Sequence, residues 1–512
     1  MINGVLMRVR FELTIKKDNK DAVAEALKAK IVQQLKFTPS DVHFVEVYNL
    51  DGELNDAELE ILGKEVFVDS VLHDNKIREP AFLESWRIEI GMLPGVTDNI
   101  ANSAQQVIKD VTGKKVEVHY SRMYSISGLL DVDRCNKIAA MLHNPLLEKY
   151  ILHYPRTVPE PYLPKVVIRH EPKVEKISLH MSAVRWTALM QERLLTLSLD
   201  DFRAIRRYFR SAKIIEQRKK IGLDTRITDV ELEAIAQTWS EHCKHRIFNA
   251  NITYTEEGEP HAINSLFRTF ISGATEQSKK PYVVSVFKDN GGIIKFNHEY
   301  DIAVKVETHN APSALDPYGG ALTGILGVQR DVLGTGLGAE PVANMNVLCF
   351  GLLDEEKTPE KVLQPRVVYE GVIKGIEHGG NKMGIPTVNG SIVFEKEYLT
   401  RPLVYCGTVG ILPSTIKNAS TCEKIIKSGY LAVMVGGRVG KDGIHGATFS
   451  SRQLDDIVPH SVVQIGDPIT QKKMLDLIIE ARNRRLYEAI TDNGAGGLSS
   501  SVGELAQLSG GC

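Results

Sequence analysis

The chain has 512 residues, of which 43% are hydrophobic and 25% are charged, and its 62 Lys and Arg nearly balance its 64 Asp and Glu. This composition is typical of a globular protein and excludes a chain that is wholly disordered, collagenous or coiled coil. A net charge of −2 argues against a dedicated nucleic-acid or membrane-surface binder, because both need a large positive field. At about 150 residues per domain, we expect three or four domains.

No apolar run approaches the ~18 residues of a membrane span, and Arg8 and Arg10 come too early to leave a signal-peptide apolar region. The six cysteines form no Cys-x-x-Cys pair, which argues against a disulfide scaffold or an all-cysteine zinc site. We therefore expect a cytoplasmic protein with neither a membrane nor a nucleic-acid partner.

Two stretches of the N-terminal region have the same plan. The first predicts a strand over residues 9–15, a helix over about 21–35 and a strand over 42–48, and the second repeats this order between residues 86 and 120. An offset of roughly 75 residues indicates a duplicated α+β unit with half-buried strands. The unit has no clustered polar chemistry, so we expect it to be a scaffold or pairing surface.

The next segment begins with residues 155–175, whose five prolines and mixed charges indicate a linker. A basic helical stretch from Arg203 to Lys220 follows. Its charges predict either a phosphate or nucleic-acid contact or a solvated helix face, and the lack of an aromatic ladder favours the solvated face.

A helix is predicted to begin at Thr228, whose side chain forms a capping box with Glu231, and to run along an apolar stripe through Trp239 toward His242 and Cys243. His242, Cys243 and His245 follow closely, which suggests a metal site, but Cys243 would point about 100° away from His242 and no second Cys/His cluster lies nearby. We therefore do not expect zinc. His242 is either a core histidine at a helix end or a histidine held ready to act on a substrate.

The segment 300–310 alternates apolar and polar residues with the period of a strand. Lys305, Glu307 and His309 therefore project from one face, where they can supply a phosphate contact, a Mg²⁺ ligand and a general base. The alternative is an exposed polar face with a salt bridge. The other face carries Ile302, Val304 and Val306.

Glycines are concentrated between Asp316 and Gly338. Residues 334–339 formally fit the GxGxxA dinucleotide fingerprint, but Pro341 leaves no room for the required helix and no strand precedes the turn. The sequence has no GxxxxGK[ST] motif. We expect these glycines to let backbone amides approach phosphate oxygens. Arg330 and Asp331 lie in the same run and can offer a phosphate contact beside a metal carboxylate.

Further glycine-rich segments follow. Residues 379–386 predict a turn, and residues 436–446 predict a loop after a strand over 430–435. Residues 464–468 are predicted to end a strand and open a helix, and Asp492 is predicted at a strand end before a helix whose N-terminus could hold an anion. Each loop alone is compatible with an ordinary turn. Together with three carboxylates, they indicate a Mg²⁺–nucleotide site without a Walker motif.

In their order and spacing, these motifs resemble those of phosphoribosylformylglycinamidine synthase, an amidotransferase of purine synthesis. The resemblance covers about residues 227–512. It implies an ATP-dependent ligase in which the formamide oxygen of formylglycinamide ribonucleotide attacks the γ-phosphate of ATP and glutamine-derived ammonia then displaces phosphate. The matching motifs are Trp239-Ser240-Glu241-His242-Cys243, Val306-Glu307-Thr308-His309-Asn310, Asp316-Pro317-Tyr318-Gly319-Gly320-Ala321, Arg330-Asp331, and Asp492 with its Gly-Ala-Gly-Gly-Leu tail.

The resemblance also implies a role for each matching residue, with ATP and Mg²⁺ as cofactors. His242 would be the active-site histidine and His309 the proton acceptor. Lys305 and His245 would contact ATP, although short forms of the family have Tyr at the second position. The Mg²⁺ ligands would be Glu307, Asp331 and Asp492. The substrate contacts would be Thr308, Asn310, Ala311, Arg330 and Gln464, of which Ala311 stands where many members have His.

The fold class implied is α+β: a duplicated scaffold domain resembling the family's small separate subunit, a helical linker, and the first half of an AIR-synthase-like (PurM-like) ATP-binding module. We place the domains at 1–155, 156–228, 229–415 (the sheet domain) and 416–512 (an incomplete α/β domain). The chain stops before the expected Glu-Ser-Gln motif, second synthase half and glutaminase domain. We therefore expect the N-terminal portion of a longer protein, inactive alone and supplied with ammonia by a glutaminase domain or subunit.

Two alternatives stay open. The first is another PurM-like synthetase, such as an aminoimidazole ribonucleotide or selenophosphate synthetase, against which the Trp-Ser-Glu-His-Cys motif and the long N-terminal region argue. The second is a non-catalytic nucleotide- or nucleic-acid-binding scaffold built around Arg203–Lys220.

Overall fold

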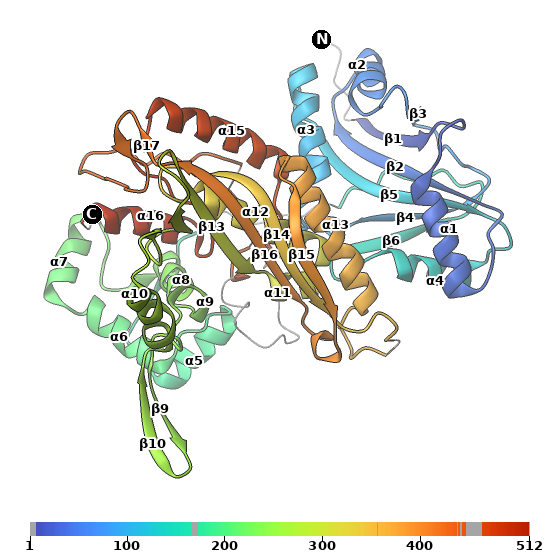
Figure 1. Ribbon diagram of the computed structural model, residues 1–512. Helices are drawn as coiled ribbons and strands as arrows, with labels where there is room; N and C mark the ends of the chain where they lie inside the picture. Colours follow the sequence, from blue (N-terminus) through green and yellow to red (C-terminus); the bar gives the residue numbers. More distant parts are fainter. Residues whose placement is uncertain are drawn as a thin grey trace. The chain divides into compact units, whose positions relative to one another are not determined.

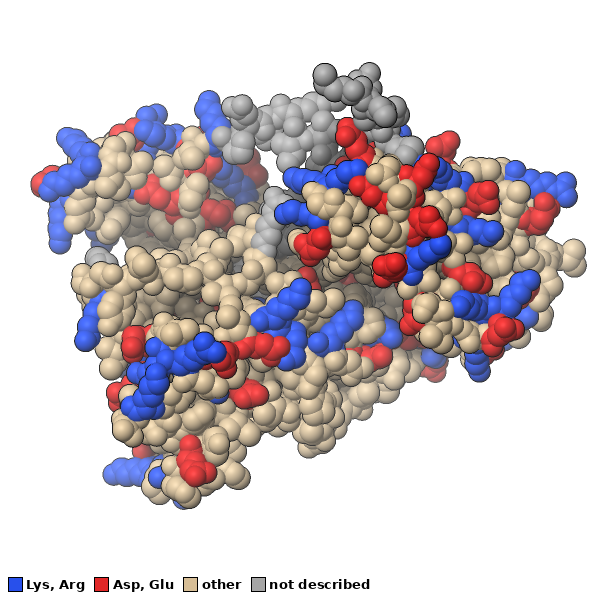
Figure 2. Space-filling view, turned by 90° about the horizontal axis from the view of Figure 1, so that it is seen from above, with Lys and Arg blue, Asp and Glu red and all other residues tan. Residues whose placement is uncertain are grey.

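A computed structural model describes residues 7–164, 173–355, 357–437, 439–440, 443–446 and 463–510. The chain forms two compact units, one up to residue 169 and one from residue 170 (Figure 1). None of the helices in the described ranges combines the length and apolar character needed to cross a membrane. On the face seen in Figure 2, Lys and Arg lie among Asp and Glu, as the near-zero net charge predicts.

The N-terminal unit is built on one antiparallel sheet with the strand order β3-β1-β2-β5-β4-β6. Its strands are β1 (Met7–Ile15), β2 (Asp41–Gly52), β3 (His73–Ile77), β4 (Trp86–Met92), β5 (Glu117–Ser127) and β6 (Glu148–His153). Its helices are α1 (Ala22–Leu35), α2 (Asp56–Ile61), the π-helical turn η1 (Leu62–Val66), α3 (Asn99–Thr112) and α4 (Val132–Leu142).

The two halves of this unit repeat the same local contacts. Asp21 caps α1 with one carboxylate oxygen, and its other oxygen accepts a hydrogen bond from the backbone N of Phe44 on β2, at 2.9 Å. Asp98 caps α3 in the same way, and its other oxygen accepts from the backbone N of Tyr120 on β5, at 3.0 Å. The structure thus repeats the predicted strand–helix–strand plan and adds β3, α4 and β6, which the sequence analysis did not predict.

Charged residues of β1 and β4 are more deeply buried than half-buried strands would require. Arg10 is 6% exposed, Glu12 0% and Glu89 1%. Arg10 forms ion pairs with Glu12 at 2.7 Å and with Glu89 at 3.0 Å, so it links the two halves of the unit. His153 on β6 also contacts Glu89, with Nε2 and Oε2 2.8 Å apart.

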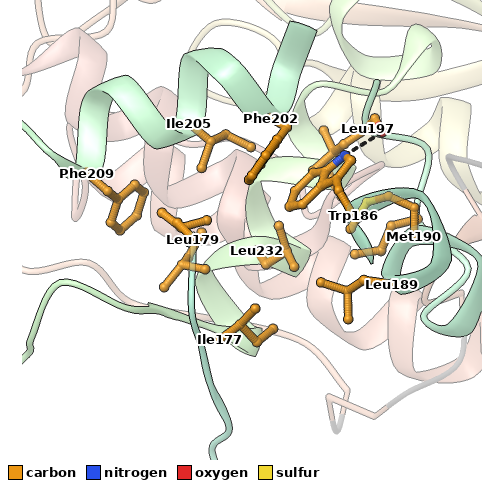
Figure 3. Packing of buried hydrophobic residues seen from close by; sticks show 13 residues of the cluster. Ile177, Leu179, Trp186, Leu189, Met190, Leu197, Phe202, Ile205, Phe209 and Leu232 are labelled. Atoms are coloured by element: carbon orange, nitrogen blue, oxygen red, sulfur yellow. Dashed lines mark hydrogen bonds between the residues drawn. The ribbon is translucent and has the colours of Figure 1, made fainter. Parts of the chain in front are cut away.

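The second unit begins with a small helical core (Figure 3). Trp186 and Phe202 stack with ring centroids 4.5 Å apart, and Trp186 Nε1 donates a hydrogen bond to the Leu197 carbonyl. These residues lie in or next to α5 (Ala183–Glu192) and α6 (Leu199–Phe209), which pack with α8 (Asp229–Thr238). The other elements of this region are α7 (Ala212–Lys220), α9 (Glu241–Lys244) and the paired short strands β7 (Lys176–Ile177) and β8 (Ile227–Thr228).

The predicted capping box of α8 is confirmed, since Thr228 and Glu231 exchange side-chain-to-backbone hydrogen bonds. The helix does not continue to Cys243 as expected. It ends at Trp239, and Ser240 starts the short helix α9 by accepting a hydrogen bond from Cys243 N. Serine competes well at helix N-caps, which explains the break.

The main body of the second unit is a six-stranded sheet with the order β11-β12-β13-β16-β14-β15. Only β14 and β15 are parallel to each other. Helices α12 and α13 pack on the sheet and on each other (Figure 1). The elements are β11 (Val283–Ser285), β12 (Gly292–Lys295), β13 (Tyr300–Thr308), α11 (Asn310–Leu315), α12 (Pro317–Leu333), β14 (Glu340–Phe350), α13 (Pro365–Met383), β15 (Thr387–Phe394), η3 (Lys396–Tyr398) and β16 (Leu403–Pro413).

The glycines that suggested loops between residues 316 and 338 lie mostly inside α12. A Cβ on Gly320 would lie 2.5 Å from the backbone N of Ser313, and one on Gly324 would lie 2.9 Å from His309 Cβ. On α13, a Cβ on Gly375 would lie 2.5 Å from the Tyr318 carbonyl oxygen. These glycines therefore bring α12 close to its neighbours. The segment 379–386, predicted as a turn, is the end of α13, which Gly384 closes in a left-handed conformation.

A hairpin of β9 (Asn251–Glu256) and β10 (Glu259–Asn264) projects from this unit (Figure 1). It leads into η2 (Phe267–Ser272) and α10 (Gly273–Ser278). After β16 come the short pair β17 (Thr415–Ile416) and β18 (Ala419–Ser420), then α15 (Pro468–Arg484) and α16 (Gly497–Leu508).

The strands predicted over 430–435 and at Asp492 are wrong, because the described residues between 421 and 510 contain no strand. The strand predicted before residue 464 lies outside the described residues. Leu431 is 90% exposed and Val433 78%. These apolar residues have strand-like sequences, but a strand needs a ladder partner and none pairs with them in the described ranges. The loop 436–446 lies partly outside the described residues.

Candidate active site

The polar row of β13 points toward α12. Lys305 Nζ lies 3.1 Å from Asp331 Oδ2, and His309 lies against Gly324 of the same helix. Glu307 also acts electrostatically on Lys305 and Asp331. The apolar row of β13 lies on the outer face of the sheet, where Val306 is 40% exposed. The sequence therefore predicted the alternation, and the structure places the polar row inside and the apolar row outside.

The segment before α16 brings a second carboxylate to this place. Arg330 Nε lies 3.6 Å from Asp492 Oδ2. Asn290, in the loop between β11 and β12, donates hydrogen bonds through Nδ2 to Asp492 Oδ1 at 2.9 Å and to Asp331 Oδ1 at 3.3 Å. The predicted residues Lys305, Arg330, Asp331 and Asp492 thus come together, although they belong to distant segments of the chain.

The pKa of each of the two aspartates is raised, mainly by burial. Burial raises the pKa of Asp331 to about 6, because the nearby carboxylate of Glu307 adds to the effect and Lys305 only partly opposes it. Burial and the charge of Asp331 raise the pKa of Asp492 to about 6. Burial acts to lower the pKa of Lys305, but the attraction of these carboxylates outweighs it, so that pKa is raised.

Two imidazoles stand beside the cluster. Burial lowers the pKa of His309 to about 4, with a partial offset from the Gly320 backbone and a further lowering by His242 and Arg330. Burial also lowers the pKa of His242, and the charges of His245 and Lys305 act in the same direction. His309 is therefore neutral near pH 7.

His242 lies on the short helix α9, and its electrostatic interactions with Lys305 and His309 place α9 beside the sheet. His245 ends α9 in a left-handed conformation and is exposed. No group of three or more His, Cys, Asp or Glu that could hold a metal ion exists among the residues the structure describes. Cys243 carries a free thiol whose pKa is raised, mainly by burial.

The remaining predicted contacts lie at different places. Thr308 is exposed on the outer, apolar row of β13. Asn310 Oδ1 accepts a hydrogen bond from the backbone N of Val404 at 2.8 Å, and Ala311 is buried in α11. The backbone of Gln464 is held by Thr323 on α12, while its side chain is exposed. The structure does not bring the side chains of Thr308 and Gln464 into the carboxylate cluster.

The chemistry of the cluster suits Mg²⁺ in its donors. Asp331 and Asp492 carry carboxylate oxygens, the donor type that Mg²⁺ prefers, and one or two carboxylates commonly hold this ion together with phosphate oxygens. Asp492 is paired with Arg330 and Asn290. Lys305 and Asn290 occupy part of the coordination space of Asp331.

The glycine turn at residues 334–339 does not offer its amides to a ligand. Gly336 N donates to Asp289 Oδ2 at 2.7 Å, and Leu337 N donates to the Thr421 carbonyl at 2.7 Å. Gly338 N donates to the Thr335 carbonyl at 3.0 Å. The expectation that these amides approach phosphate is therefore wrong, because each already has a partner within the protein.

Sequence reasoning missed the contacts that join the loop 286–291 to segments more than 100 residues later in the chain. Lys424 forms a buried ion pair with Asp289, and Thr491 Oγ1 donates to Asn290 Oδ1 at 3.2 Å. The available signal was Asp289-Asn290-Gly291-Gly292, a polar pair before two glycines. This pattern predicts a turn but does not identify its partners.

The basic stretch 203–220 is largely engaged within its own region. Arg203 pairs with Asp200 and Lys220 with Glu216. Arg218 is 7% exposed and pairs with Glu231. Ser211 divides the stretch into α6 and α7. These contacts favour local structural roles over a continuous phosphate-binding face.

Three domain families match the second unit. The N-terminal domain of AIR synthase related proteins matches residues 288–412, and the corresponding C-terminal domain matches residues 427–511. The formylglycinamide ribonucleotide amidotransferase linker domain matches residues 187–246. Lys305, Arg330 and Asp331 thus fall in the first of these domains and Asp492 in the second, while most of the helical core of Figure 3 falls in the linker match.

Among curated proteins, the phosphoribosylformylglycinamidine synthase subunit PurL of Thermoplasma acidophilum is 36% identical over 328 residues, which cover 64% of this chain and 38% of that protein. The PurL subunit of Moorella thermoacetica is 34% identical over 283 residues, covering 55% of this chain and 34% of that protein. The chain therefore spans less than two-fifths of the length of these relatives. Among solved structures, T. maritima PurL complexed with FGAR is 28% identical with a TM-score of 0.40, covering 58% of this chain and 42% of that one.

The fold and the matched domains define the second unit as an AIR synthase related module preceded by an amidotransferase linker. Over the aligned residues the chain is similar to phosphoribosylformylglycinamidine synthase PurL subunits, at 34–36% identity to the two relatives named above.

Proposed function

We propose that this chain is part of an ATP-dependent ligase that converts formylglycinamide ribonucleotide and glutamine-derived ammonia into formylglycinamidine ribonucleotide. The observation that carries the proposal is the convergence of Lys305, Arg330, Asp331 and Asp492 beside His309, in a chain that matches these domain families. The domain boundaries near residues 155, 228 and 415 belong to the same proposal.

Each side chain has a role that its surroundings support. Lys305 and Arg330 offer cations to phosphate oxygens, and Glu307, Asp331 and Asp492 would hold Mg²⁺, which neutralises phosphate charge during transfer. His309 is neutral at pH 7 and can take a proton from the attacking ammonia. His242 stands next to Lys305 and His309, which fits a contact with the reacting group.

The remaining assignments are weaker in geometry. Asn310 and Ala311 hold the chain at the end of β13, and we propose that they shape the substrate site rather than supply its main polar contacts. Thr308, His245 and Gln464 would need a change of conformation or an added segment to contact ATP or substrate. A glutaminase would supply ammonia, and the five described cysteines with free thiols fit a reducing cytoplasm.

Thermal unfolding with and without Mg²⁺–ATP tests ATP binding. Wild-type chain should be stabilised, by about 2.7 kcal/mol when ATP is at 100 times its dissociation constant. Glu307→Ala should lose this stabilisation, and Glu299→Ala should keep it because Glu299 is exposed on the turn before β13. A wild-type chain that Mg²⁺–ATP does not stabilise would contradict the proposal.

A second experiment tests whether the chain alone is sufficient for synthase activity. The 512-residue chain, given formylglycinamide ribonucleotide, ATP and ammonium, should form no product. The same chain supplemented with the missing part of a PurL relative should form product if the two associate. Product from the isolated chain would overturn the view that it is one part of a longer enzyme.

A further inference from the structure

Asn290 connects three side chains that belong to two separate parts of the second unit. Its Nδ2 donates to Asp331 on α12 and to Asp492 before α16, while its Oδ1 accepts from Thr491. The partners are 41, 202 and 201 residues away in sequence, so no local structure requires these contacts. A single amide thus connects the two carboxylates through Nδ2 and contacts Thr491 through Oδ1.

The surroundings leave room for this amide and hold it in place. A Cβ on Gly334 would lie 3.0 Å from Asn290 Nδ2 and 3.2 Å from the backbone N of Asp492. The neighbouring Asp289 is fixed by its buried ion pair with Lys424 and by the amide of Gly336. The loop 286–291 is therefore attached to residues on both sides of the cluster.

Asn290 offers Asp331 and Asp492 a hydrogen-bond donor that carries no negative charge. Two carboxylates that face each other repel, and an amide N–H shared between them reduces that repulsion without occupying all their lone pairs. An aspartate of the same shape at this position would add a further negative charge, and an alanine would leave both carboxylates without the bond.

We infer that Asn290 is a positioning residue that sets the separation and orientation of Asp331 and Asp492 for a divalent cation. The inference rests on the proposed function, in which these carboxylates hold Mg²⁺. Partners that orient metal ligands contribute about 10- to 100-fold to metal affinity in other proteins. We expect a loss at the lower end of this range, because Asp331 also keeps its contact with Lys305.

The first test measures Mn²⁺ binding to the 512-residue chain by electron paramagnetic resonance, well below the unfolding temperature. Asn290→Ala should bind Mn²⁺ about tenfold more weakly than wild type. Asn251→Ala, at an exposed position of the β9–β10 hairpin, should bind as wild type does. An unchanged Mn²⁺ affinity in Asn290→Ala would overturn the inference.

The second test measures backbone amide exchange over residues 487–497 in the metal-free chain. Asn290→Ala and Asn290→Asp should both exchange faster than wild type, because neither can donate to the two carboxylates. If Asn290→Asp restores wild-type exchange, the residue acts through its shape alone and the inference fails. A wild-type chain that binds no Mn²⁺ would overturn the proposed function, and this exchange comparison would then decide on its own whether Asn290 connects the two segments.

Discussion

Lys305 on β13 and Asp331 on α12 form an ion pair with 3.1 Å between Nζ and Oδ2, and their side chains are only 29% and 11% exposed. Glu307 and Asp492 add their charges to this pair, so one lysine faces three carboxylates. Burial is the main reason why the pKa of Asp331 rises despite the ion pair, and the charge of Glu307 adds to the rise. With Arg330 beside Asp492, two cations face three carboxylates. A bound divalent cation would correct the imbalance.

This imbalance predicts a pH dependence of Mg²⁺ binding. The pKa of Asp331 and that of Asp492 are about 6, so protons compete with the cation as the pH falls through that value. We expect the affinity for Mg²⁺ to fall about tenfold between pH 7.5 and pH 5.5. Calorimetric titration with MgCl₂ at constant ionic strength would measure it, and an affinity independent of pH would contradict the placement of the cation at these residues.

The same shift predicts that Asp492→Asn stabilises the metal-free chain. A carboxyl whose folded-state pKa is raised favours the folded state below its ordinary pKa, near 4, and that advantage is lost as the pH rises through about 6. Removing the charge should therefore raise the free energy of unfolding at pH 7.5, by about 1 kcal/mol more than at pH 5. Denaturant unfolding at both values tests this. Asp476→Asn, on the exposed side of α15, is the control and should show no such difference.

The sequence predicted features that depend on local spacing. The alternation of β13 brought Lys305 and His309 to one face, and the capping box located the start of α8 at Thr228. Both follow from the periods of strands and helices and from hydrogen bonds within four residues. The duplication of the N-terminal unit was visible for the same reason, since each half repeats a short local pattern.

Features that depend on distant contacts were not predictable. The glycines of α12 resembled loop residues, because the close approach of His309 and Ser313 that requires them is a property of the folded unit. No sequence pattern indicated the role of Asn290, because its partners are up to 202 residues away. The exposed outer face of β13 also contradicts the usual expectation that the apolar row of a strand is buried.

The glycine contacts between α12 and α13 predict a sharp difference between two glycine-to-alanine substitutions. A Cβ at Gly375 would lie 2.5 Å from the Tyr318 carbonyl oxygen and 2.9 Å from Leu322 N, and both atoms are backbone. Because neither can move without displacing α12, Gly375→Ala should cost about 2–3 kcal/mol of stability. Gly503→Ala on α16 meets no atom within 4 Å and should be neutral or stabilising by up to about 1 kcal/mol. Denaturant unfolding of both variants compares them, and equal effects would contradict the packing argument.

The buried charges of the N-terminal unit give the last prediction. Burial acts to raise the pKa of Glu89, but hydrogen bonds from His153 and Arg10 outweigh it and hold that pKa at about 2. Glu89 therefore stays ionised, and Arg10→Met would leave it and Glu12 with much less compensation in a buried place. Breaking one partner of a buried pair costs about 3–5 kcal/mol.

Arg8 on the same strand provides the matched control for Arg10. Its side chain is 64% exposed, and its Nε lies 4.0 Å from Oδ2 of Asp51, whose side chain is 3% exposed. Because only one partner is buried and the separation is long, Arg8→Met should cost about 1 kcal/mol, much less than Arg10→Met. Amide exchange of β1 and β4 reports the opening of this unit separately from the second unit, and it should accelerate strongly in Arg10→Met and little in Arg8→Met. If the two variants exchange alike, Arg10 does not hold the two halves of the duplicated sheet together, and the apolar contacts of the helices alone must do so.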